Sequence, residues 1–343
     1  MVPPLPRPPP PRPARPGGLA EPRPVHAPAG GALVPGPRAG DPRAGARQDR
    51  AVSGETGLDL SRARRGTREL THRAGANFSV GFRFLPRERR QAVYAAYAFC
   101  RHADDAVDEG DPETAPARLQ EWADELDATY AGRPRTETGV ALLAALPRFP
   151  IPRQAFEGLI AGCRQDLVKT RYATFAELLG YCDLVATTIS TISLAIFGGL
   201  GDPEAEARGR DLATALQLTN VVRDVGEDVG RGRVYLPLED LARFGVTEEE
   251  LLSLRPTPRL SALVAFEAER ALGYFRAAEP VKDLVDPPCR FAVTMMGGVY
   301  AEVAARVARR PEAPLSGRVS LSRGEKVRAV LARLLRRRFV LGD

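Results

Sequence analysis

Residues that form disulfides or bind transition metals are scarce in this sequence of 343 residues, which has four Cys and three His. The cysteines lie far apart and lack the CxxC spacing of a zinc or redox site. We therefore expect reduced, mostly buried thiols and no disulfide framework. The cysteines are Cys100, Cys163, Cys182 and Cys289.

Long apolar runs are also missing. The longest, residues 184–200, is interrupted by Thr and Ser and preceded by Asp183, which favours a buried core helix over a membrane span. The N-terminus lacks the continuous apolar core of a secretory signal, so a cytoplasmic location is expected. No Gly-rich dinucleotide fingerprint follows a strand, and NADPH is not predicted, although a reductive enzyme could bind it without that motif.

Proline and positive charge are unevenly distributed. Fifteen of the 31 prolines fall in the first 50 residues, where eight Arg oppose three acidic residues and supply +5 of the formal net charge of +6. Such a segment buries too little apolar surface to offset chain entropy, so we predict a disordered Pro/Arg-rich tail over residues 1–65 and one folded domain over 66–343. A basic tract is compatible with nucleic acid, a membrane or no partner, and no nucleic-acid ligand is predicted.

From about residue 70 onward, apolar residues recur at intervals of three and four, without an alternating strand pattern. The predicted fold class is therefore all-α, a single helical bundle with a central cavity. Pro86 opens a helix that ends near Asp108, before Gly110 and Pro112. Further helices are expected at 114–131, 137–146, 152–167, 174–197, 203–229, 247–253, 258–278, 288–309 and 322–339.

Two pairs of aspartates share one spacing, Asp104 with Asp108 and Asp224 with Asp228. On a helix, residues four apart share a face, where like charges cost about 0.2–0.5 kcal/mol. The repetition of this cost indicates bound cations. Carboxylate oxygens without His or Cys favour a hard ion, and Mg²⁺ completes its shell with water and substrate phosphates. The pattern therefore indicates a diphosphate substrate.

Each pair also has a simpler interpretation. The first segment could be a salt-bridged surface helix in which Arg101 pairs with Asp104 or Asp105, but its other positions are apolar or small and leave no solvated face. The second could be a calcium loop at 224–232, but it lacks the alternating oxygen ligands and the terminal Glu of such loops.

Both segments resemble the two signature regions of the squalene/phytoene synthase family of head-to-head prenyl transferases. The resemblance is carried by YAFCRHADDAVD and by ALQLTNVVRDVGEDVGRGRVYLPLEDLARFGV, with supporting stretches at 78–101 and 166–186. It extends from about residue 72 to the C-terminus. Two signatures in this order and spacing make the match far more specific than either DxxxD motif alone.

The resemblance implies an isoprenoid-synthase fold, in which the two motifs face each other across a cavity and the four aspartates bind Mg²⁺, with Mn²⁺ as the alternative ion. Basic side chains beside the carboxylates, Arg231 and Arg233, would clamp a leaving diphosphate. Other residues are assigned by position: diphosphate contacts Arg101 and Arg223, site tyrosines Tyr97, Tyr181 and Tyr235, substrate-site residues Gln217 and Asn220, and channel walls Phe78 and Val185.

The sequence departs from the family pattern in two places. Upstream of Phe78, where relatives carry a small hydroxyl and basic cluster that holds diphosphate, it has Gly75-Ala76-Asn77. After Tyr181, where relatives commonly have V-A-G-x-V-G, residues 185–190 are VATTIS. We expect the loss of these two glycines to narrow the channel that holds the prenyl chain.

The function that the resemblance implies is Mg²⁺-dependent condensation of two identical prenyl diphosphates at their C1 atoms through a cyclopropyl intermediate. The main hypothesis is geranylgeranyl diphosphate to phytoene, a step of carotenoid biosynthesis. The alternative is farnesyl diphosphate to presqualene diphosphate, squalene or dehydrosqualene. A terpene cyclase or head-to-tail elongase fits the motifs poorly, and a catalytically inactive helical binding protein would not need four intact carboxylates.

The C-terminal segment 324–340 places apolar and basic residues on opposite sides of a predicted helix. Such a helix could lie on an anionic membrane as a peripheral anchor, or be the last helix of the bundle with a solvated basic face. The sequence favours the bundle helix, while a hydrocarbon product keeps the membrane contact as the alternative. The sequence predicts no oligomeric state.

Overall fold

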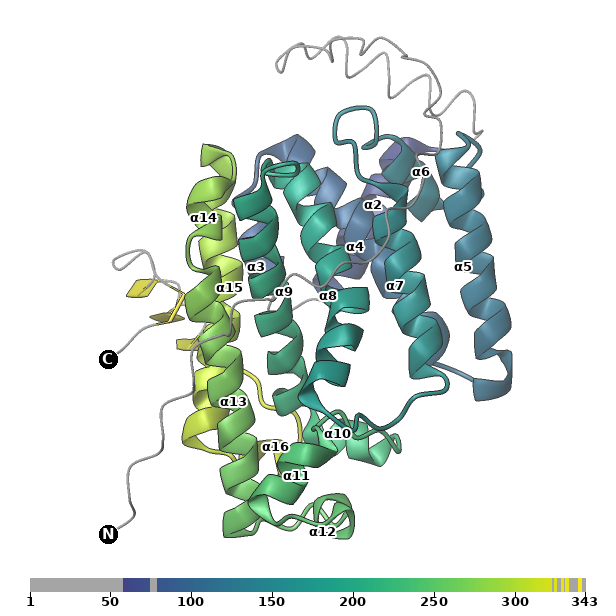
Figure 1. Ribbon diagram of the computed structural model, residues 1–343. Coiled ribbons are helices and arrows are strands. Elements are labelled where there is room, and N and C mark those ends of the chain that lie inside the picture. The colour runs from purple at the N-terminus through teal and green to yellow at the C-terminus, as the bar shows by residue number, and fades with distance from the viewer. Residues whose placement is uncertain are drawn as a thin grey trace, which may run out of the picture. The chain divides into compact units, whose positions relative to one another are not determined.

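The computed structural model describes residues 58–74, 79–322, 324–325, 328–329, 331–332 and 339–340. Every regular element in this part of the chain is a helix, so the predicted all-α class is confirmed (Figure 1). The elements are α2 (Leu60–Ala74), α3 (Ser79–Phe82), α4 (Arg87–Asp108), η1 (Pro112–Thr114), α5 (Ala115–Tyr130), α6 (Glu137–Leu143), α7 (Arg153–Asp166), α8 (Phe175–Phe197), α9 (Pro203–Arg223), α10 (Val225–Gly230), α11 (Leu238–Phe244), α12 (Glu248–Leu252), α13 (Pro258–Ala278), α14 (Val281–Leu284), α15 (Pro287–Arg309) and α16 (Ala313–Ser316).

Long helices form the centre of the bundle. Helix α9 packs against α8, α13 and α15, and α8 also packs against α7. Figure 1 shows α7, α8 and α9 running side by side, with the short helices α10, α11 and α12 gathered at one end. Buried residues occur along the whole length of α15, as is typical of a central helix that is apolar on nearly every side.

Two described helices, α8 and α15, are long and apolar enough to cross a membrane by length and composition alone. Within the bundle, 72% of the apolar window of α15 and 44% of that of α8 are buried. Core helices pass the same test of composition. The apolar stretch at 184–200 lies up to Phe197 in α8, which has neighbours on two sides, α7 and α9, as predicted for a core helix.

Helix α2 begins inside the segment that was predicted to be a disordered tail. Leu60, Ala63, Thr67 and Thr71 are buried and recur at intervals of three and four, so they form one face of the helix. This face packs against α4 and α6. The folded part therefore begins before the predicted boundary at residue 65, because the apolar face of α2 is short and is interspersed with arginines.

The predicted helix at 203–229 is interrupted. Helix α9 ends at Arg223, Asp224 has φ −107° and ψ 14°, and α10 follows as a separate turn. Gly226 permits this arrangement, because a Cβ atom there would lie 2.9 Å from the backbone oxygen of Pro314. Close backbone contact with the α16 segment thus sets the direction of α10. The apolar periodicity along 203–229 contains no information about this contact, so it could not predict the break.

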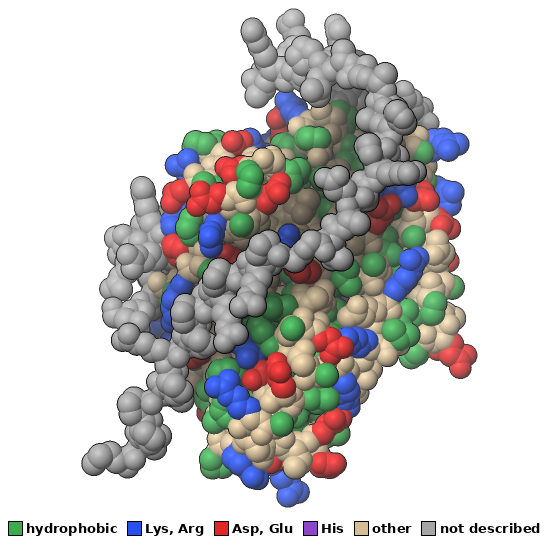
Figure 2. Space-filling view, in the orientation of Figure 1, with side chains coloured by type: hydrophobic (Ala, Val, Ile, Leu, Met, Phe, Trp, Pro, Cys, Tyr) green, Lys and Arg blue, Asp and Glu red, His purple; other side chains and the backbone are tan. Residues whose placement is uncertain are grey.

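The surface of the bundle carries charges of both signs. Figure 2 shows Lys/Arg and Asp/Glu side chains interspersed over the face in view. Because the first 50 residues supply +5 of the formal +6, the remainder of the chain is nearly neutral. The high isoelectric point of the sequence therefore belongs mainly to its N-terminal part.

Several predictions concern residues outside the described part of the chain. These are the tail up to residue 57, the departure at 75–77, the channel wall Phe78 and most of the C-terminal segment 324–340.

Candidate functional site

The first aspartate pair lies on the last turns of α4. Asp104 is half-buried, Asp108 is more exposed, and the two stand one helical turn apart. The thiol of Cys163, on α7, donates a hydrogen bond to Asp104 Oδ1 at 3.3 Å. Burial, reinforced by the negative charges of Asp108 and Asp166, raises the pKa of Asp104 to about 7. The carboxylate form of Asp104 is therefore disfavoured unless positive charge lies nearby.

The second pair lies where α9 passes into α10. Arg223 is buried, and its Nε donates to Asp224 Oδ1 at 2.8 Å. Arg318 Nε lies 3.4 Å from the same oxygen. Burial, reinforced by the charge of Asp224, raises the pKa of Asp228 to about 7. Each motif thus contains one carboxyl group whose ionised form is penalised by its surroundings.

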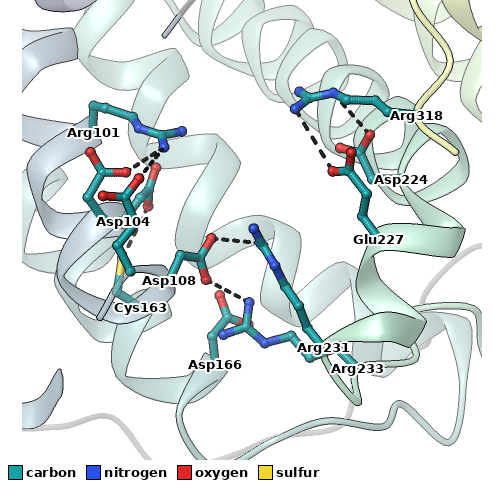
Figure 3. A network of polar contacts seen from close by, with 12 residues as sticks. Arg101, Asp104, Asp108, Cys163, Asp166, Asp224, Glu227, Arg231, Arg233 and Arg318 are labelled. Carbon is teal, nitrogen blue, oxygen red and sulfur yellow. Dashed lines mark hydrogen bonds and ion pairs between the residues drawn. The ribbon is translucent and has the colours of Figure 1, made fainter. Parts of the chain in front are cut away.

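Two arginines connect the motifs (Figure 3). Arg233 Nη1 donates to Asp108 Oδ1 at 2.8 Å, and Arg231 Nη1 donates to Asp108 Oδ2 at 3.3 Å. Both arginines follow α10 in the sequence, so a segment of the second motif reaches the carboxylate of the first. The charge of Asp108 also raises the pKa of Asp228. The two motifs therefore line one polar space with carboxylates on both sides and guanidinium groups between them.

Asp166, the last residue of α7, belongs to the same space and was not predicted as a site residue. Tyr181 donates its hydroxyl proton to Asp166 Oδ2 at 2.8 Å, and Tyr235 donates to Oδ1 at 3.0 Å. Burial raises the pKa of Asp166 and of both tyrosines. The sequence signal was a lone Asp at the end of a predicted apolar helix, and its two partners, Tyr181 and Tyr235, were predicted as site tyrosines.

Arg101 and Tyr97 lie on the same face of α4 as the first motif. Arg101 forms ion pairs with Asp105 at 2.5 Å and Glu109 at 3.7 Å, so its guanidinium adopts the salt-bridged arrangement of the simpler interpretation. The ring of Tyr97 packs edge-on against Phe82, with centroids 6.4 Å apart. Burial raises the pKa of Tyr97 to about 12, so this hydroxyl is protonated at neutral pH.

An apolar cavity of about 140 Å³ begins beside the second motif. Gln217 and Asn220 line it one to two turns before Asp224, and Val185 lines it from α8. Three predicted substrate-site residues are thus brought together. Its other walls come from α8, α9, α14 and α15 and are mostly aliphatic: Ala186, Ile189, Ser190, Ser193, Leu194, Phe197, Gly209, Leu212, Ala213, Leu216, Val281, Val285, Val293 and Met296.

Glycines on neighbouring helices face two of the hydroxyl side chains of α8, and one of these, Ser190, stands where the family has glycine. A Cβ atom on Gly209 of α9 would lie 2.5 Å from Ser190 Oγ, and one on Gly158 of α7 would lie 2.7 Å from Thr188 Oγ1. Thr187 donates its hydroxyl proton to Asp183 at 3.1 Å and does not line the cavity. Of the two positions that lost a glycine, only Ser190 therefore reaches the cavity, where it faces a glycine.

The polar space has the composition of a divalent-cation site. Within the described residues, no three Asp, Glu, His or Cys side chains converge on one point, and arginines contact Asp108 and Asp224. The available donors are nevertheless all oxygen atoms, as a hard cation requires. The buried Oδ1 of Asn220 accepts no hydrogen bond from any residue the structure describes. Together with the raised pKa of Asp104 and Asp228, this indicates a place where cations would be stabilised.

Sequence comparison finds relatives over most of the chain. A family model, that of squalene/phytoene synthase, matches residues 71–325. The 15-cis-phytoene synthase of Synechocystis sp. is 42% identical over 224 residues, which cover 62% of this chain and 66% of that protein. The phytoene synthase of Arthrospira platensis is 36% identical over 255 residues, covering 71% of this chain and 82% of the relative.

Solved structures with the same arrangement of helices are also found. A dehydrosqualene synthase in complex with ligand superposes with a TM-score of 0.75 at 27% identity, covering 81% of this chain and 97% of the other. The squalene synthase HpnC from Alicyclobacillus acidocaldarius superposes with a TM-score of 0.68 at 30% identity, covering 78% of this chain and 100% of the other. The similarity in fold therefore extends over about four fifths of this chain.

Proposed function

The chain belongs to the squalene/phytoene synthase family, and from that premise we propose that it condenses two molecules of geranylgeranyl diphosphate head to head to give phytoene. It is a prenyl transferase, an enzyme of isoprenoid biosynthesis. One observation carries the proposal: the carboxylate and arginine cluster begins one helical turn beyond the apolar cavity, since Asn220 lines the cavity and Asp224 follows four residues later. This arrangement suits a substrate with a diphosphate head and a hydrocarbon tail. The resemblance to phytoene synthases at 36–42% identity favours the C20 substrate.

The polar space would hold the diphosphate groups. Arg231, Arg233 and Arg318 surround the carboxylates, and guanidinium groups bind diphosphate oxygens through paired hydrogen bonds. The family depends on divalent metal ions, and we assign Mg²⁺ to Asp104, Asp108, Asp224 and Asp228. When bound there, Mg²⁺ supplies a Lewis acid that stabilises negative charge on the departing diphosphate.

The reaction proceeds in two ionisations. In the first, the C1–O bond of one substrate breaks and diphosphate leaves with the electron pair. The C2–C3 double bond of the second substrate bonds to that C1, and loss of a proton gives a cyclopropylcarbinyl diphosphate. The second diphosphate then leaves, the carbon skeleton rearranges, and loss of another proton gives the linear C40 product. Two protons and two diphosphates account for the balance, so no reductant is consumed.

The chain's own residues would position the substrate and exclude water. Aliphatic walls such as Leu212 and Leu216 keep water from the allylic cation, which would otherwise be hydrolysed. Gln217 and Asn220 mark the border between the hydrocarbon cavity and the polar space. Tyr181 and Tyr235 hold Asp166 between them and orient its carboxylate toward the first motif.

A second candidate is condensation of farnesyl diphosphate to a C30 product. It is favoured by the 30% identity to the squalene synthase HpnC and by Ser190, whose side chain occupies part of the cavity wall. A squalene-type reaction would consume a hydride from NADPH, whereas presqualene diphosphate or dehydrosqualene would not. A catalytically inactive binding protein is disfavoured, because carboxylates occupy all four metal positions.

Product analysis distinguishes these functions. We would supply the purified chain with Mg²⁺ and either geranylgeranyl or farnesyl diphosphate, with and without NADPH, and identify the products by mass. A C40 hydrocarbon from the longer substrate, formed without NADPH, supports the proposal. A C30 product or presqualene diphosphate as the sole product would instead support the second candidate, and no turnover of either substrate would contradict both.

A further inference from the structure

An exposed aromatic and basic surface lies where α4 and α15 begin. We call it the Phe84 surface, and it consists of Arg83, Phe84, Arg87, Arg290 and Phe291. The side chain of Phe84 is 49% exposed, although its ring packs edge-on against Phe291 with centroids 4.6 Å apart. The backbone N–H of Phe84 donates to the Gly81 oxygen at 3.1 Å. The aromatic ring is therefore presented to solvent from a fixed turn.

Three arginines lie close in sequence to the rings of Phe84 and Phe291. Arg83, Arg87 and Arg290 are exposed, and none of them forms an ion pair with any residue that the structure describes. The acidic residues next to them in sequence are already engaged by other arginines. Glu88 pairs with Arg148 at 2.6 Å, and Asp286 pairs with Arg89. The Phe84 surface therefore has a net positive charge beside an exposed aromatic side chain.

The Phe84 surface adjoins the wall of the hydrocarbon cavity. Helix α3, immediately before it, lies on α15 so closely that a Cβ atom on Gly81 would be 2.6 Å from Met296 Cγ. Met296 and Val293 of α15 line the cavity. The carboxylates lie at the opposite end of α4, since the 17 residues from Arg87 to Asp104 span about 25 Å at 1.5 Å per residue.

We propose that the Phe84 surface binds the headgroup region of an anionic lipid bilayer. Aromatic rings insert at the boundary between headgroups and acyl chains, and arginines beside them bind anionic headgroups. This surface differs from the C-terminal segment that the sequence suggested as an anchor. Binding through the Phe84 surface would place the apolar part of the cavity toward the bilayer and the diphosphate end of the site toward water. The proposal does not depend on which prenyl diphosphate the enzyme uses.

A label placed at residue 84 tests the proposal directly. All four native cysteines are buried, so Phe84→Cys in the full chain introduces an accessible thiol for an environment-sensitive fluorophore. The matched control is Leu252→Cys on α12, because Leu252 is 41% exposed and lies beyond the second motif. We expect vesicles of phosphatidylcholine and phosphatidylglycerol to shift the emission of the label at 84 to shorter wavelength and to leave that at 252 unchanged.

Three outcomes would overturn the proposal. One is an unshifted label at 84 on protein that sediments with the vesicles, which would assign binding to another segment. Another is an equal shift at 84 and 252. The third is a shift without vesicles that grows with protein concentration, which would identify a second copy of the chain as the occupant.

The charges are tested separately by vesicle sedimentation of the unlabelled full chain. Since each arginine near an anionic surface contributes roughly fivefold to binding, neutralising all three should weaken the affinity about 100-fold at low salt. The variant is Arg83→Gln/Arg87→Gln/Arg290→Gln, and the control removes three other exposed arginines, Arg133→Gln/Arg210→Gln/Arg255→Gln. Equal losses in both variants would show a general charge effect and contradict the assignment. Thermal unfolding of both variants checks that they fold.

Discussion

The two aspartate motifs have the same spacing in the sequence but are built differently. Asp104 and Asp108 lie on the uninterrupted helix α4, so the helix itself sets their separation. Asp224 has φ −107° and ends α9, and Asp228 belongs to the six-residue helix α10. The geometry of the second pair therefore depends on the tertiary contacts that hold α10, whereas the geometry of the first pair does not.

The helices that carry the motifs differ as well. The buried face of α4 is made largely of alanine, which allows neighbouring helices to approach closely. Helix α9 instead presents Leu212, Leu216 and Gln217 to the hydrocarbon cavity. The first motif thus stands on a structural helix and the second on a wall of the substrate site. A change in the cavity should consequently affect the second motif more than the first.

The largest effect is expected from removing a carboxylate of either motif. For Asp104→Asn and Asp228→Asn we expect kcat for phytoene formation to fall about 1,000-fold, because each change removes negative charge from the proposed cation site. If the two motifs act together on one diphosphate, the double variant should lose little more than either single variant. Steady-state product formation at saturating Mg²⁺ measures this.

Folding of these variants is checked by thermal unfolding. Neither substitution should lower stability, since burial already penalises the ionised form of both groups. Near-parental activity in both variants would contradict the assignment of the aspartates.

The long helices and the residues of the two aspartate motifs could be predicted from the sequence. The long helices have many turns of apolar periodicity, and the motifs contain the residues that face the polar space. The short helices α3, α11, α14 and α16 were not predicted, because four to seven residues give few turns of periodicity, although the equally short α6 and α12 were predicted. The break at Asp224 was also missed, since it depends on Pro314, about 90 residues away. Asp166 was overlooked because its tyrosine partners come from other parts of the chain.

The next largest effect concerns the arginines that join the motifs. Arg233 is 15% exposed and lies 2.8 Å from Asp108, whereas Arg231 is 52% exposed and lies 3.3 Å from it. For Arg233→Gln we expect about a 100-fold loss of kcat, typical of a lost donor to developing negative charge. For Arg231→Gln we expect only about a threefold loss, because solvent screens an exposed charge. A greater loss for Arg231→Gln would reverse the assigned importance of the two arginines.

The dependence of the second motif on tertiary contacts is tested with two glycines of α10. For Gly226→Ala we expect the free energy of unfolding to fall by about 1–3 kcal/mol, because the new Cβ would collide with the Pro314 oxygen at 2.9 Å. Gly230→Ala is the matched control. No atom lies within 4 Å of the position that its new Cβ would occupy, so we expect a gain of about 0.5 kcal/mol from reduced chain entropy. Chemical denaturation measures both, and equal stabilities would show that α10 can shift without cost.

The smallest expected effect is on kcat/KM. It tests whether α9, which carries the second motif, forms a wall of the substrate site, as α4 does not. A Cβ atom on Gly209 would lie 2.5 Å from Ser190 Oγ, so Gly209→Ala should push Ser190 into the cavity. We expect kcat/KM for geranylgeranyl diphosphate to fall about tenfold, the cost of a misplaced methyl group in an apolar site, and that for farnesyl diphosphate to fall less. Adding Ser190→Gly removes the closer of two collisions and leaves the one with Leu194 Cδ1 at 2.9 Å, so it should restore part of the loss. Failure of this rescue would mean that Gly209 is required for the packing of α9 on α8 and that the cavity does not select substrate length at this position.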